Sequence, residues 1–136
     1  MLRDSYNGFK VDSAFDYAGR TASANGEIID LQGFGGCGFV IQLATVTTAD
    51  GSNYFTFTIE HGDASNLSDA AVVTSATGLL GSNLVVNDTG QSDTVSKMGY
   101  VGGKRYVRLV ATETGTASAA FSAVAVRTLA TAQPVA

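Results

Sequence analysis

The chain has 136 residues, a formal net charge of −4, and charged residues at only 15% of its positions. This length suits one domain with a single core, and the negative charge argues against a nucleic-acid partner, because nucleic-acid-binding domains are usually strongly basic. The single cysteine, Cys37, excludes an internal disulfide, and no apolar run approaches the roughly 18 residues of a membrane span.

Residues 1–24 predict an extended arm. They hold four aromatic residues, Tyr6, Phe9, Phe15 and Tyr17, which are separated by polar residues and glycine without a sustained two-residue period. Aromatic side chains in such a segment need a surface that buries them. Two interpretations remain open: the segment lies as coil over its own core, or it docks on a neighbouring subunit or on a host surface.

Residues 25–127 predict an antiparallel β-sandwich of jelly-roll-like type. Helix signals are nearly absent, whereas several runs alternate with a two-residue period. In the clearest run Phe55, Phe57 and Ile59 point inward; Phe39, Ile41 and Leu43 share a face in the same way, as do Phe121, Ala123 and Ala125. In chain order we expect strands at 27–31, 39–46, 54–60, 71–74, 84–87, 97–101, 105–112 and 118–127.

Two turn sequences predict hairpins. Residues 49–52, Ala-Asp-Gly-Ser, separate the runs 39–46 and 54–60, and Gly102-Gly103 separates 97–101 from 105–112. We therefore expect each pair of runs to form neighbouring antiparallel strands. Residues 128–136, which contain the single proline, predict a loosely ordered tail.

The residue types that carry chemistry are scarce. His61 is the only histidine and follows the end of an expected strand, which favours a solvated loop over a catalytic relay. The glycine-rich segment 33–38 lacks a following Lys-Ser/Thr and precedes a strand, so we interpret it as a bend and not as a phosphate loop. Cys37 within it is expected to be a small buried hydrophobe. We expect no enzyme activity, no cofactor and no metal site.

The basic segment Lys104, Arg105, Arg108 holds three of the eight basic residues. Strand alternation puts Lys104, Tyr106 and Arg108 on one face, where the Arg108 guanidinium can stack on the Tyr106 ring and bind a carboxylate. Two interpretations remain open here as well. The segment is a solvated cationic face, or it pairs with acidic groups of a partner subunit.

Three motifs occur in a characteristic order: Ile-Asp-Leu-Gln-Gly-Phe at 29–34, an aromatic strand that ends near Glu60, and Gly-Tyr-Val-Gly-Gly-Lys-Arg-Tyr-Val-Arg at 99–108. This order, with Thr-Gly-Thr at 114–116, resembles that of small structural proteins of tailed bacteriophages over roughly residues 27–127. Members of that group include capsid decoration (cement) proteins, which sit as trimers on the outside of the shell. Residues 66–68 depart from the Gly-x-Ser/Thr loop frequent there, and a histidine follows Glu60.

The resemblance implies a virion protein on the capsid surface that is made in the host cytoplasm. We expect a homotrimeric decoration protein that binds the major capsid protein and stabilises the assembled head, without contacting nucleic acid or membrane. The alternatives are a head–tail adaptor or tail component, and a carbohydrate-binding module with Tyr6, Tyr17 or Tyr54 as its platform. The expected partner-binding residues are Tyr6, Phe9, Phe15, Tyr17, Lys104, Tyr106 and Arg108.

Overall fold

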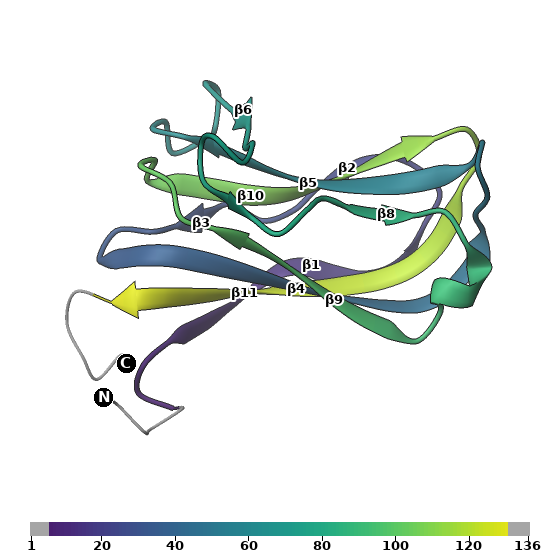
Figure 1. Ribbon diagram of the computed structural model, residues 1–136, viewed down its shortest axis with the longest axis horizontal. Helices are drawn as coiled ribbons and strands as arrows, with labels where there is room; N and C mark the ends of the chain where they lie inside the picture. Colours follow the sequence, from purple (N-terminus) through teal and green to yellow (C-terminus); the bar gives the residue numbers. More distant parts are fainter. Residues whose placement is uncertain (1–5, 131–136) are drawn as a thin grey trace.

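The computed structural model describes residues 6–130, which form two antiparallel sheets packed face to face (Figure 1). One sheet has the order β1 (Lys10–Arg20), β11 (Ser118–Ala130), β4 (Phe34–Thr48), β9 (Thr94–Tyr100) and β7 (Leu79–Leu80). The other contains β2 (Ala24–Asn25), β3 (Ile29–Asp30), β10 (Tyr106–Thr114), β5 (Tyr54–Gly62), β6 (Ala71–Val72) and β8 (Leu84–Val86). A single 3-10 turn, η1 (Thr89–Gln91), precedes β9.

The strand order is that of a jelly roll. The sheets read β1-β11-β4-β9 and β2/β3-β10-β5-β8, and the chain passes repeatedly from one sheet to the other along its length. The predicted all-β sandwich is confirmed. Within the described residues, no helix is long and apolar enough to cross a membrane.

Both predicted hairpins are wrong. The strand β4 pairs with β11 and β9, whereas β5 pairs with β10, so the turn at 49–52 joins the two sheets. The Gly102-Gly103 turn likewise joins β9 in one sheet to β10 in the other. Each run has one buried face, and two such runs can bury those faces either side by side or across the sandwich. Their two-residue period does not distinguish these arrangements.

The N-terminal segment is an edge strand and not an arm over residues 10–20. Strand β1 pairs with β11, but its register shifts between Ser13 and Phe15 and again between Phe15 and Ala18. These β-bulges interrupt the two-residue alternation, which explains why the sequence pattern does not predict this strand. The sandwich also extends past its predicted boundary at residue 127, because β11 runs to Ala130. The expectations for residues 1–5 and 131–136 lie outside the described residues.

The core consists of the inward faces that alternation predicts. The side chains of Phe39, Phe57 and Phe121 have no exposed surface. The Phe121 ring lies 4.9 Å from the Phe57 ring and 5.5 Å from the Phe15 ring, both edge-to-face, between the two sheets. Cys37 is buried as expected, and this burial raises the pKa of its thiol to about 12.

Candidate interaction surface

The basic segment is charge-compensated within its own chain. Lys104 Nζ lies 2.7 Å from a carboxylate oxygen of Asp63, and the Arg105 guanidinium donates two hydrogen bonds of 2.9 Å to Asp30. Arg105 also donates to the Gln32 side chain at 2.7 Å. The hydrogen bond from Arg105 holds the pKa of the Asp30 carboxyl below its ordinary value.

Arg108 pairs across the sheet with Glu60, which occupies the facing position on β5. Its Nε and Nη2 atoms each lie 3.1 Å from Glu60 Oε1, and the two side chains are only 18% and 19% exposed. The predicted stacking of Arg108 on Tyr106 is wrong, because the guanidinium of Arg105 lies over that ring, 5.0 Å from its centroid. The three cations therefore do not depend on a partner subunit for a counter-charge.

His61 is buried and not in a solvated loop, because β5 extends past the predicted end to Gly62. Its Nδ1 lies 2.9 Å from the Tyr100 hydroxyl, and that oxygen accepts a hydrogen bond of 3.1 Å from the Lys104 backbone N–H. A hydroxyl can both donate and accept, so the His61–Tyr100 hydrogen bond forms with either tautomer of the imidazole ring. Burial lowers the pKa of His61, and the charge of Lys104 lowers it further.

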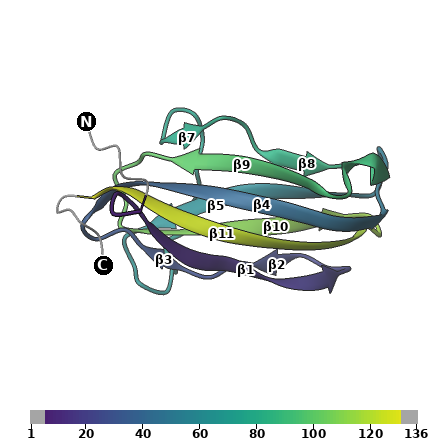
Figure 2. The same cartoon turned by 90° about the horizontal axis from the view of Figure 1, so that it is seen from below.

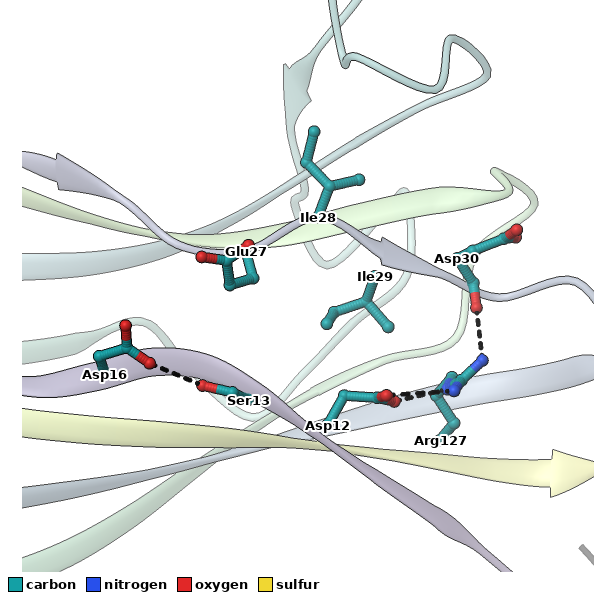
Figure 3. A pocket seen from close by; sticks show the side chains of 8 residues that line it. All are labelled: Asp12, Ser13, Asp16, Glu27, Ile28, Ile29, Asp30 and Arg127. Carbon is teal, nitrogen blue, oxygen red and sulfur yellow. Dashed lines mark hydrogen bonds and ion pairs between the residues drawn. The ribbon is translucent and has the colours of Figure 1, made fainter. Parts of the chain in front are cut away.

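An acidic groove of about 480 Å³ lies between β1 and the β2–β3 segment (Figure 3). Within it, Arg127 binds the Asp12 carboxylate with bonds of 2.7 and 3.2 Å and donates to the Asp30 carbonyl at 3.0 Å. Asp16 accepts a hydrogen bond from Ser13 at 3.3 Å. The lining residues are Asp12, Ser13, Asp16, Glu27, Ile28, Ile29, Asp30 and Arg127. Among the described residues, no group of three or more His, Cys, Asp or Glu could hold a metal ion.

The outer face of the five-stranded sheet carries an uncharged strip. One row of directly paired residues crosses all five strands: Val11, Val126, Gly38, Gly99 and Leu80. Paired residues in adjacent antiparallel strands point to the same side of a sheet, so this row forms a continuous uncharged strip. Val11 and Leu80 are 53% and 55% exposed. Solvent-facing strand positions are ordinarily polar, so this outer face is a candidate interaction surface.

A hollow of about 480 Å³ lies in the middle of this face, over the Gly38–Gly99 pair. A Cβ atom on Gly38 would meet no atom within 4 Å. Lys97, in the neighbouring row opposite Val40, stands beside the hollow. The lining residues are Gly38, Val40, Leu80, Gly81, Lys97, Met98, Gly99, Val126 and Thr128. The sequence prediction missed this hollow because Gly38 and Gly99 become neighbours only when β4 pairs with β9.

The predicted partner-binding residues do not form one site. Phe15 is a core residue with 4% exposure, which corrects its assignment to an exposed anchor. Tyr6 and Tyr17 are 81% and 68% exposed, and Phe9 is half-buried. Lys104, Tyr106 and Arg108 lie at or before the start of β10 in the other sheet.

No protein-family model matches the chain, and no curated protein matches it. The SPBc2 prophage-derived protein YomS is similar in structure, with a TM-score of 0.49 and 12% identity over 87% of this chain and 92% of that one. A chain from the disulfide-linked pili of Bacillus endospore appendages has a TM-score of 0.45 and 10% identity over 96% and 98%. A chain of infectious bursal disease virus, Gx strain, has a TM-score of 0.48 and 12% identity over 89% of this chain and 32% of that one. Likenesses this distant assign no function to the chain.

Proposed function

We propose that the chain is a phage capsid decoration protein that binds the outside of the assembled head and bridges neighbouring subunits of the major capsid protein. The observation that carries this proposal is the uncharged strip across the outer face of the five-stranded sheet, from Val11 to Leu80. The motif at residues 99–108, with its resemblance to phage structural proteins, supports the same function.

The mechanism is burial of apolar surface without chemistry. Each Å² of apolar surface that leaves water contributes roughly 25 cal/mol, so a sheet face lined with valine and leucine favours a dry partner surface. If only the assembled shell presents that surface, binding stabilises the shell over its free subunits by mass action. Heads that lack the protein are expected to assemble, but to open at lower temperature than decorated heads.

Binding of purified protein to heads that lack it tests the proposal. Val124 is 42% exposed on β11, in the row next to the uncharged strip, and Val124→Glu places a charge on the outer face. We expect this variant to fold and to lose head binding in a co-sedimentation assay. The matched control is Val72→Glu, because Val72 is 52% exposed on β6 in the other sheet.

Two outcomes overturn the proposal. If Val124→Glu and Val72→Glu bind heads equally well, the outer face of the five-stranded sheet is not the binding surface. If electron microscopy finds the bound protein only at the tail vertex or along the tail, the chain is an adaptor or tail component and not a decoration protein.

A further inference from the structure

The packing of the chain explains one glycine of the Gly38–Gly99 pair but not the other. A Cβ on Gly99 would lie 3.0 Å from the Leu80 Cβ, so the packing of β7 explains that glycine. No such neighbour explains Gly38, which lies inside a long strand, where a side chain would stabilise the sheet. Glycine inside a strand often marks close approach of another group, and an aromatic ring is a common cover for it.

Lys97 makes the hollow favour an occupant that carries a negative charge. Within residues 6–130, four of the seven Lys and Arg side chains form ion pairs with carboxylates, and Lys97 is one of the three that form none, with Lys10 and Arg20. Among the residues that line the hollow, Lys97 is the only charged one. The hollow therefore fits an aromatic side chain that has a carboxylate next to it.

Strand β1 carries this combination at Asp16 and Tyr17. The register shift between Phe15 and Ala18 forms a bulge, and both intervening side chains are exposed, Tyr17 at 68%. Within residues 6–130, Asp16 forms no ion pair, and its side chain accepts a single hydrogen bond, from Ser13. The acidic residues of the groove beside β1 add to the negative potential around it.

Tyr17 lies on the edge strand β1, whereas the hollow lies over β4 and β9, on the other side of β11. Strand β1 forms one edge, whereas β9 and β7 form the other, with β11 and β4 between them (Figure 2). Tyr17 therefore cannot reach the hollow of its own chain, but it can reach that of a neighbouring copy. Such a contact joins two different surfaces, so it is head-to-tail and closes into a ring when the rotation between copies permits.

We propose that a second copy of this chain places its Tyr17 ring on the Gly38–Gly99 hollow and its Asp16 carboxylate against the Lys97 ammonium. This inference rests on the proposed function only in that both use the outer face of the five-stranded sheet. The hollow near β9 binds the neighbouring copy. The valines of β1 and β11 face the shell.

Sedimentation equilibrium of the full chain over a range of concentrations tests the contact. Gly38→Val puts a side chain into the hollow, where its Cβ meets no atom within 4 Å, and is expected to raise the dissociation constant about tenfold or more. Gly51→Val is the matched control, because a Cβ at Gly51 also meets no atom within 4 Å but lies in the turn between β4 and β5. Far-ultraviolet circular dichroism verifies that both variants remain folded.

A charge exchange tests the orientation of the two copies. Lys97→Glu and Asp16→Lys are each expected to weaken association, and the double variant is expected to restore it, because the opposite charges face each other again across the interface. High salt is expected to weaken association of the wild type and of the double variant alike.

The outcomes separate this inference from the proposed function. A wild type that is monomeric at every concentration overturns the inference, as does a Gly38→Val protein that associates like the wild type. If Val124→Glu still loses head binding in that case, the decoration function stands without this contact. If self-association behaves as expected but the wild type fails to bind heads, the contact stands and the proposed function fails.

Discussion

The Nδ1 atom of His61 and the hydroxyl oxygen of Tyr100 lie 2.9 Å apart and connect the ends of β5 and β9, two strands that belong to different sheets. Tyr100 is 1% exposed, and its hydroxyl also anchors the following loop through the Lys104 N–H. The loop passes so close to the ring that a Cβ on Gly102 would overlap it. This contact closes one end of the sandwich where the chain crosses between the sheets.

Tyr100→Phe is expected to destabilise the fold by about 1–3 kcal/mol, because it leaves His61 Nδ1 and the Lys104 N–H without their partner. Urea denaturation measures the loss in the free energy of unfolding. Tyr106→Phe is the control, since the half-buried Tyr106 hydroxyl has no hydrogen-bond partner among residues 6–130. Equal losses in the two variants would show that the His61–Tyr100 contact contributes nothing specific.

The stability of the protein is expected to fall as the pH drops below about 6.5. Burial and the nearby Lys104 charge lower the folded-state pKa of His61 from its ordinary value of 6.5, whereas Asp63 and Asp69 partly oppose this shift. Between the folded and the unfolded pKa the unfolded chain binds a proton that the folded chain does not, so acid favours unfolding in that window. Above the unfolded pKa the contribution is fully present.

His61→Gln is expected to flatten the dependence of the free energy of unfolding on pH between about 5 and 8. The chain has no other histidine, and the lowered pKa values of Asp30, Asp50 and Asp69 start from 3.8, so those carboxyls titrate in a separate, more acidic window. An unchanged slope in the variant would contradict the assignment of this pH dependence to His61.

Arg108→Met is expected to cost about 1–3 kcal/mol, because it leaves the largely covered Glu60 carboxylate without its counter-charge. Lys104→Met is expected to cost less, since Lys104 and Asp63 are 44% and 63% exposed and water screens their interaction. Chemical denaturation of both variants compares the two losses. A larger loss for Lys104→Met would reverse this order of importance.

Phe15→Ala is expected to destabilise the fold by about 3–5 kcal/mol, because it empties a core position next to the Phe57 and Phe121 rings. Tyr17→Ala, two residues away, is the control and is expected to stay within about 0.5 kcal/mol of the wild type, since Tyr17 is exposed.

Removal of residues 2–20 deletes β1 and is expected to prevent stable folding. A truncated chain that unfolds like the wild type would mean that β1 is not part of the stable sandwich.

Local alternation in the sequence was sufficient to predict the fold class and most of the core. Whether Phe55, Phe57 and Ile59 face inward depends only on a two-residue period and on the hydrophobic effect, and the structure buries all three. The same principle failed for Phe15, because the β-bulges in β1 break the period there. The turn sequences predicted the bends but not the partners of the strands on either side.

Apart from the bulged β1, the two-residue period predicts the long strands and the apolar face of each, because both depend on neighbours along the chain. Which strands lie side by side, and therefore which side chains meet, depends on the folding of the whole chain. Arg108 faces Glu60, His61 contacts Tyr100, and Gly38 lies opposite Gly99, although each pair is distant in the sequence. The jelly-roll order brings such pairs together, since the chain passes repeatedly between the two sheets.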